Sequence, residues 1–330
     1  MRICPTHPVL SLAEKPADTA PSWDLGTCVP HKIFGVRGLV PRMHPSLRSL
    51  SLTINSTCRY SMASQVDLSP FRELRHLRWR APSAHHLDAL SSAIRQNAAH
   101  LESLDLDFVR WRRLWRDLCD DEDTDAFDAG TERRYFSDQV LRLDGHSPRP
   151  LFPVIRVLSL SQVPLSPELA RAINVDALEC LTLRMCPAWG DFLSELAGPH
   201  TRVRLNTLEI QSSAGQADTA ESADALRSFL ASFQGLRELA IWTPGPLGTL
   251  QLWDVVARHH ATLRRFVYHQ RVDCANIRME QDLPDLGVRR RALESIRIDP
   301  AENPLAQLDL EFVGLACAPK RLVSSAALRR

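Results

Sequence analysis

The chain is poor in the residues on which several kinds of active site depend. It holds 13 glycines in 330 residues, and the turn Gly245-Pro246-Leu247-Gly248 lacks the lysine and the spacing of a phosphate-binding loop. Neither a G-x-S-x-G elbow nor an H-E-x-x-H sequence occurs in it. These absences predict a protein that is not an enzyme and that uses no cofactor.

The cysteines and the apolar residues are too dispersed for a disulfide framework, a zinc site or a membrane span. Eight cysteines lie at long intervals with no C-x-x-C pair, which predicts reduced, mostly structural thiols. No run approaches the roughly 20 apolar residues that cross a bilayer, and Pro5, His7, Pro8 and Glu14 interrupt any signal peptide. We expect a soluble, cytoplasmic or nuclear protein without a membrane partner.

Lysine is also scarce, since the chain has only Lys15, Lys32 and Lys320 among its 40 lysines and arginines. A GC-rich coding sequence explains this bias. A ubiquitin-ligase receptor that avoids offering lysines for its own modification is the alternative explanation. The net charge of +1 gives no overall attraction to nucleic acid.

What the chain does have is a repeated six-residue spacing, in which apolar residues occupy the first, fourth and sixth positions. Leu47-Leu50-Leu52 is the first unit. The intervals between units are 27, 27, 54, 23, 27, 31, 27 and 30 residues, and the 54 predicts an insertion in place of one unit. The units begin at Leu47, Leu74, Leu101, Ile155, Leu178, Leu205, Leu236, Leu263 and Leu293.

Each unit is expected to form one short strand followed by a helix. The fourth and sixth residues lie on one side of a strand, because side chains alternate across it. One such strand cannot bury its apolar side alone, whereas parallel neighbours bury a continuous core. Ser83, Ser166 and Gly235 mark helix ends between the strands. The predicted fold class is α/β, a right-handed solenoid with a parallel concave sheet and helices on its convex side.

This pattern resembles the leucine-rich-repeat family over residues 41–312. In that family a polar side chain three positions after the third aliphatic residue bonds the backbone of the turn, and Asn55 and Cys186 occupy this position. Units of 23 to 31 residues with occasional cysteine are most similar to the divergent repeats of fungal F-box proteins, although no F-box is visible. Six of the remaining units depart from the turn pattern and predict an irregular solenoid; they carry Pro82, Val109, Val163, Ser213, Pro244 and Arg271.

The resemblance implies a non-catalytic scaffold for protein binding. One candidate role is that of a substrate receptor in ubiquitination, with a Skp1-type adaptor as a partner. The alternative is a repeat protein that regulates another enzyme as an inhibitor or a GTPase activator. Three regions are predicted: an irregular N-terminal segment over 1–40, the solenoid over 41–312 with an insertion over about 107–150, and a C-terminal tail over 313–330.

The insertion allows two further interpretations. Residues 121–132 have the acidic spacing of a calcium loop, but Ala126 stands where the loop requires glycine, so a solvated acidic loop is the alternative. Residues 110–116 interleave tryptophan with arginine, as single-stranded nucleic-acid sites do. The tryptophans share a helical stripe with leucines, which favours burial, so no nucleic-acid partner is expected.

The adjacent histidines His85-His86 and His259-His260 diverge by about 100° on a helix, so neither pair easily shares one metal ion. We expect surface histidines and no metal site.

A protein partner is expected on the concave face, which displays the third and fifth positions of each unit and the position just past the sixth. Tryptophan and arginine are the residues that most often dominate binding energy. Burial of Trp242 beneath the turn at Pro244-Gly245-Pro246 is the alternative for that side chain. The predicted contact residues are Arg184, Glu209, Glu238, Trp242, Arg265 and His269.

Overall fold

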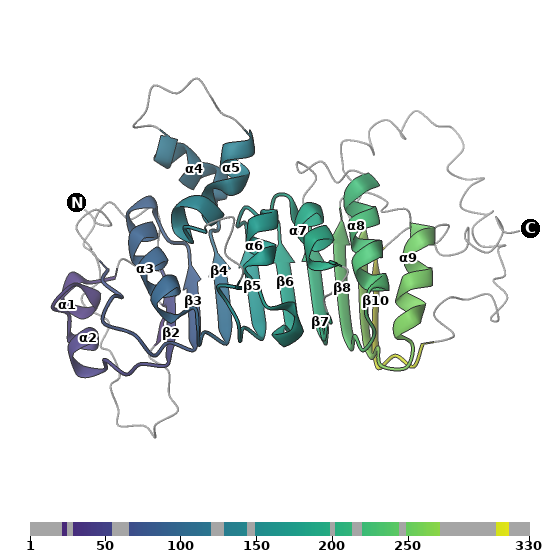
Figure 1. The fold of residues 1–330 in the computed structure, drawn as a ribbon, viewed down its shortest axis with the longest axis horizontal. Helices are drawn as coiled ribbons and strands as arrows, with labels where there is room; N and C mark the ends of the chain where they lie inside the picture. Colours follow the sequence, from purple (N-terminus) through teal and green to yellow (C-terminus); the bar gives the residue numbers. More distant parts are fainter. Residues whose placement is uncertain are drawn as a thin grey trace, which may run out of the picture.

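The computed structural model describes residues 22–24, 29–54, 66–119, 129–143, 149–198, 202–212, 220–243, 249–270 and 308–316. Figure 1 shows an elongated molecule in which the strands stand side by side along the long axis and the helices form a second layer. The chain advances along this axis strand by strand.

The strands of the described residues form one ten-stranded sheet in which the order along the chain is also the order in space. Every neighbouring pair is parallel. An α/β fold built on a parallel sheet is therefore confirmed. The strands are β1 (Ser22–Trp23), β2 (Ser49–Thr53), β3 (His76–Arg80), β4 (Ser103–Asp107), β5 (Val157–Ser161), β6 (Cys180–Arg184), β7 (Thr207–Gln211), β8 (Glu238–Thr243), β9 (Arg265–Gln270) and β10 (Phe312–Ala316).

The repeat spacing sets the register of this sheet. Leu77 of β3 lies opposite Leu104 of β4, and the same row of buried residues continues to Phe266 of β9. A second buried row runs from Trp79 to Tyr268, both at most 1% exposed. Removing one such side chain from water stabilises the fold by about 1.5–3 kcal/mol, so the aligned rows supply much of the core.

Backbone hydrogen bonds fix the register where each strand begins. The N–H groups of Arg75 and His76 both donate to the carbonyl of Arg48, at 2.7 and 3.0 Å. The same pair of bonds to one carbonyl of the preceding unit recurs at the start of every strand from β4 to β10. A one-residue slip would break these bonds and turn the apolar rows out of the core.

Helices connect the strands and lie along one side of the sheet (Figure 1). The predicted cap at Ser166 is confirmed, because its Oγ accepts a hydrogen bond from the N–H of Leu169. The helix predicted to end at Gly235 stops earlier, at Ala231. The helices are α1 (His31–Phe34), α2 (Leu39–Met43), α3 (Leu87–Asn97), α4 (Trp111–Cys119), α5 (Ala129–Tyr135), α6 (Pro167–Arg171), α7 (Trp189–Leu196), α8 (Ala220–Ala231) and α9 (Thr249–Val256).

The turns out of the strands are closed mainly by backbone. Ala81, Gln162 and Met185 each follow a strand with φ of 56°, 54° and 55°. Their N–H groups donate to the last carbonyl of the next strand, at 2.7, 2.7 and 2.6 Å. These bonds stabilise the turns after β3 and β5, which lack the polar side chain of the family pattern, and also the turn after β6, which contains Cys186. Cys186 does bond the backbone as the family pattern implies, through Sγ to the carbonyl of Leu160 at 3.2 Å, whereas Asn55 lies outside the described residues.

The predicted insertion contains helices and no strand within its described residues, since β4 pairs directly with β5. In Figure 1, α4 and α5 project from the layer of helices above β4. A π-helix at Phe136–Val140 follows α5. Trp111 and Trp115 are 3% and 8% exposed, so the prediction of buried tryptophans is confirmed. Trp111 also donates from Nε1 to Glu132 at 2.7 Å, which ties α4 to α5.

The two ends of the sheet differ from the predicted boundaries. Part of the segment 1–40 is regular, because it contains β1, α1 and the start of α2. The boundary predicted after residue 312 falls inside β10, whose apolar residues Val313 and Leu315 align with Phe266 and Tyr268 of β9. The described sheet therefore extends to Ala316. The unit predicted at Leu293 lies outside the described residues.

Candidate functional site

The face of the sheet opposite the buried rows carries the first, third and fifth residues of each strand, and we call it the open face. Its side chains are exposed or half-buried from β2 to β7. Register places them in three rows that cross the strands. The row of fifth residues, for example, contains Thr53, Arg80, Asp107, Ser161, Arg184, Gln211, Trp242 and His269.

Arg184 and Glu209, two of the predicted contact residues, form the best-defined ion pair on this face. Arg184 donates from Nε and from its terminal nitrogen to the two carboxylate oxygens of Glu209, at 2.6 and 2.9 Å. This bond raises the pKa of Arg184, and the nearby Asp105 and Asp107 raise it further. The pair holds both side chains in one orientation.

The other four predicted residues form two separate pairs. Trp242 and His269 are opposite each other in the row of fifth residues, and both are half-buried. Glu238 and Arg265 are opposite each other in the row of first residues, with 3.9 Å between Nε and Oε1. Along one strand, first and fifth residues are about 13 Å apart. The predicted residues therefore share one face without forming one compact cluster.

The Arg265 guanidinium also lies 5.3 Å from the ring centre of Phe312, so β10 contributes a side chain to this part of the face. The repeat spacing does not point to Phe312, because it predicts the strand after β9 at the unit that begins with Leu293.

A second charged group on the open face was not among the predicted contact residues. Arg78 faces Asp105 and Arg80 faces Asp107, with 3.3 Å between nitrogen and oxygen in each pair. Beside them, Asp24 accepts hydrogen bonds from Ser51 and Thr53 at 3.1 Å. The hydroxyl of Ser22 is the largest cause of the lowered pKa of Asp24. The alternation of Arg and Asp at equivalent strand positions was the sequence signal for this group.

Short, uncharged side chains separate the two charged groups. β5 presents Val157, Ser159 and Ser161 on the open face, between the aspartates of β4 and the arginine of β6. Because neighbouring strands are about 4.8 Å apart, the aspartates of β4 and Arg184 of β6 start from backbones about 10 Å apart on either side of this strip.

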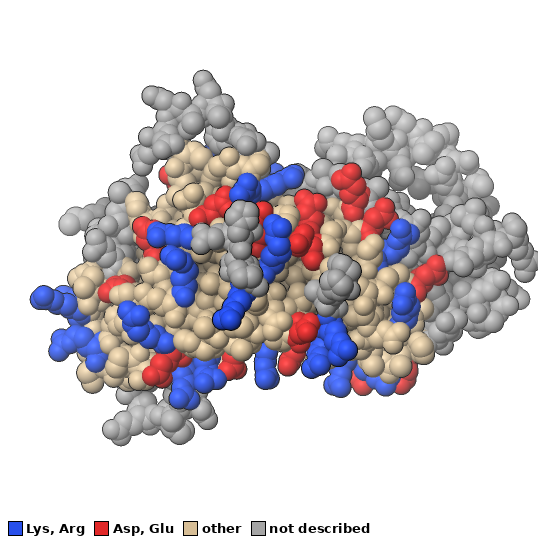
Figure 2. All heavy atoms as spheres, in the orientation of Figure 1, with Lys and Arg blue, Asp and Glu red and all other residues tan. Residues whose placement is uncertain are grey.

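Figure 2 shows acidic and basic side chains intermingled over the side of the molecule in view, without a large area of one sign. Comparison with known proteins found no matching family model, no similar curated protein and no similar solved structure.

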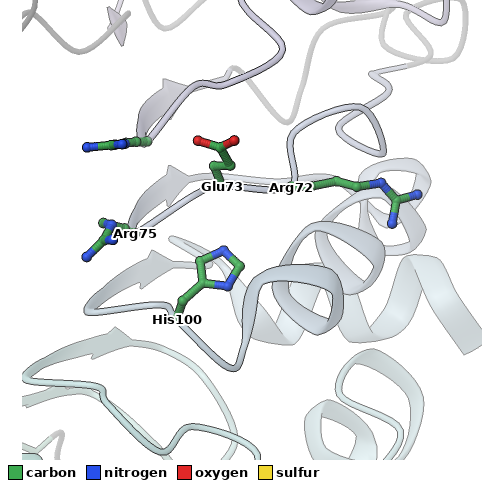
Figure 3. Close-up of a pocket in the computed structure, with 5 residues that line it drawn as sticks. Arg72, Glu73, Arg75 and His100 are labelled. Atoms are coloured by element: carbon green, nitrogen blue, oxygen red, sulfur yellow. The ribbon is translucent and has the colours of Figure 1, made fainter.

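One small pocket of about 210 Å³ lies before β3 and β4, lined by Arg48, Arg72, Glu73, Arg75 and His100. Figure 3 shows the guanidinium groups of Arg72 and Arg75 extending in opposite directions, with Glu73 and His100 between them. Arg75 is bonded to Glu102 at 2.5 Å. These cations do not converge on a common point, so the pocket is not arranged as an anion site.

The histidine pairs are partly buried, which corrects the expectation of surface histidines. His86 and His259 are 1% exposed, whereas His85 and His260 are exposed. Divergence along a helix sends one member of each pair into the core and the other to solvent. Among the described residues, no group of three or more His, Cys, Asp or Glu side chains is placed to hold a metal ion.

The acidic residues 121–128 of the calcium-loop interpretation lie outside the described part of the chain. A search of the described helices for a membrane-spanning candidate found none.

Proposed function

We propose that this protein is a non-catalytic scaffold that binds a protein partner on the open face of the sheet. The observation that carries the proposal is the alignment of three rows of accessible side chains across consecutive parallel strands. A partner segment that crosses the strands meets a new side chain of each row about every 4.8 Å, so many weak contacts add up along the sheet.

The charges of the open face support a partner with charges of both signs. The group Arg78, Arg80, Asp105 and Asp107 and the pair Arg184–Glu209 lie on opposite sides of the uncharged β5 strip. Ion pairs that are fixed before binding favour one partner orientation and reject mismatched charge. Trp242 adds an aromatic side chain of the kind that dominates binding energy.

The finer parts of the proposal rest on the resemblance of the repeats. We propose that the sheet is the concave side of a right-handed leucine-rich-repeat solenoid and that the protein acts as a substrate receptor in ubiquitination. Similarity to the repeats of F-box proteins supports the second part. A regulator of another enzyme, such as an inhibitor or a GTPase activator, would use the same face.

Affinity purification of the tagged full chain, followed by mass spectrometry, tests the proposal. The double variant R184E/W242A alters the open face, and Arg133→Glu on the exposed side of α5 is the matched control. We expect the double variant to lose a protein that the wild type and the control both retain.

The identity of the captured proteins separates the finer alternatives. Capture of a Skp1-type adaptor supports a receptor, whereas capture of a GTPase or hydrolase without the adaptor supports a regulator. A set of captured proteins that is the same for all three chains would contradict binding on the open face.

A further inference from the structure

A second accessible surface lies at the N-terminal end of the molecule, away from the open face. Val36, Leu39 and Met43 are 60%, 46% and 64% exposed, and they fall within eight consecutive residues. They account for three of the eight large apolar side chains that are exposed in the described part of the chain. Their concentration on one short stretch distinguishes them from isolated exposed apolar residues, which are common on soluble proteins.

The backbone that carries these residues is anchored to the core. Phe34 and Val40, on α1 and α2, are 3% and 4% exposed, and the N–H of Asp67 donates to the carbonyl of Phe34 at 2.7 Å. Two glycines close the turn between the helices: a Cβ at Gly35 or Gly38 would lie 2.5 or 2.4 Å from a backbone oxygen. The apolar side chains therefore project from a defined support.

The charged side chains of the segment that carries this surface have one sign. Lys32, Arg37 and Arg42 are exposed and make no ion pair within the described part of the chain. Residues 29–54 contain no Asp or Glu, although acidic and basic residues nearly balance over the whole chain, at 39 and 40. In Figure 2 the end of the molecule that carries α1 and α2 in Figure 1 shows basic side chains at its tip.

We propose that Val36, Leu39 and Met43, together with Lys32, Arg37 and Arg42, bind an acidic amphipathic helix of a protein partner. Leu39 and Met43 are four residues apart on α2 and therefore lie on one face of it, and Val36 lies in the turn that precedes α2. Together they present a short apolar patch of the kind that receives the apolar stripe of a helix. Carboxylates beside that stripe would pair with the three cations. This surface is independent of the open face, so the proposal does not rest on the proposed function.

A protein helix suits this surface better than a lipid bilayer does. Interfacial membrane anchors bury a long apolar helix face and commonly include Trp or Phe, whereas α2 has five residues and the exposed patch has no aromatic side chain.

The test uses the full chain and a labelled synthetic helix with a leucine stripe flanked by glutamates. A peptide with the same composition in scrambled order and a peptide with lysines in place of the glutamates are the matched probes. The variants are Met43→Asp and the double charge reversal R37E/R42E. Val154→Asp is the control, because Val154 is also exposed, at 41%, but lies far along the chain.

We expect binding of the acidic helix by the wild type, weakened about tenfold or more by either surface variant, reduced by added salt, and unchanged in Val154→Asp. Equal melting temperatures for all chains would show that the variants remain folded. No binding at about 1 mM peptide, or equal binding of the scrambled peptide, would overturn the proposal. Binding to phosphatidylserine vesicles that the same variants abolish, without peptide binding, would assign the surface to a membrane instead.

Discussion

Cys186 illustrates how one residue stabilises the turn between two strands. Its thiol is 1% exposed and bonds to the carbonyl of Leu160, which belongs to the neighbouring strand. Burial raises the pKa of this thiol from 9.0 to about 12. The folded protein therefore keeps the proton at pH values where the unfolded chain has lost it.

The raised pKa of Cys186 predicts a loss of stability at high pH. Its contribution is complete below pH 9.0, the ordinary thiol value, and decreases as the pH rises toward 12. Between about pH 8 and about pH 10 the free energy of unfolding should fall by about 1.4 kcal/mol through this group. Urea unfolding at both pH values measures the change. In Cys186→Ala the decrease should be smaller by that amount; an equal decrease in both chains would contradict the prediction.

The contribution of His259 to stability has the opposite dependence on pH. The N–H of Leu236 donates to its Nδ1, and its Nε2 lies 3.1 Å from the carbonyl of Leu230, which is the arrangement of a neutral ring. Burial lowers the pKa of His259 below 6.5. Since protonation is suppressed in the folded protein, the stability from this group is present above pH 6.5 and decreases as the pH falls below that value.

We expect the free energy of unfolding of His259→Leu to fall less than that of the wild type as the pH is lowered below 6.5. Denaturant unfolding at a series of pH values from neutral to mildly acidic would compare this variant with His260→Leu, in which the exposed neighbour is replaced. The His260 variant should retain the wild-type slope. Identical slopes for the wild type and His259→Leu would show that the buried ring has no role in the pH dependence.

At the scale of elements, each strand is stable only against its neighbours. Leu208 on β7 is 0% exposed and lies between Leu181 of β6 and Leu239 of β8 in one buried row. A cavity at this position removes contacts from three strands together. The cost of replacement should therefore exceed that of losing a single pairwise contact.

Leu208→Ala is expected to lower the free energy of unfolding by about 2–5 kcal/mol. Ser159→Ala, on the open face of β5, is the control and should change it by less than about 0.5 kcal/mol. Chemical denaturation measures both values. A Leu208→Ala curve that overlays the wild type would argue against the shared core.

The strands could be predicted because alternation of apolar residues is a local property that repeats at a nearly constant interval. The last strand, β10, could not be predicted in this way. Leu310-Val313-Leu315 has the required spacing, but the unit at Leu293 has it too and lies closer to the expected period. Spacing alone does not decide between them, whereas pairing of Val313 with Phe266 places 312–316 beside β9.

The sequence pattern also does not predict the backbone conformation of the turns or which charged side chains form pairs. Ala81, Gln162 and Met185 adopt positive φ without being glycine, and the N–H of each donates to the last carbonyl of the next strand. Which carboxylate pairs with which arginine follows from strand register. Arg184 and Glu209, 25 residues apart in the chain, are neighbours only once β6 and β7 are aligned.

At the scale of the whole molecule, the parallel sheet converts a repeated spacing into a long surface. The core rows stabilise it, while the first, third and fifth residues of each strand are free to differ from unit to unit. In the proposed scaffold, specificity would depend on these variable positions rather than on the fold. The open face is separate from the surface of Val36, Leu39 and Met43, so the two proposals together allow one chain to bind two partners at once.

Titration calorimetry of a purified partner, recovered through the open face, against the wild type and single variants tests the central claim most directly. Trp242→Ala and Arg265→Ala should each weaken binding by about tenfold or more, while Arg133→Ala on α5 should leave it unchanged. Equal affinity of the wild type and both open-face variants for that partner would contradict binding on the open face.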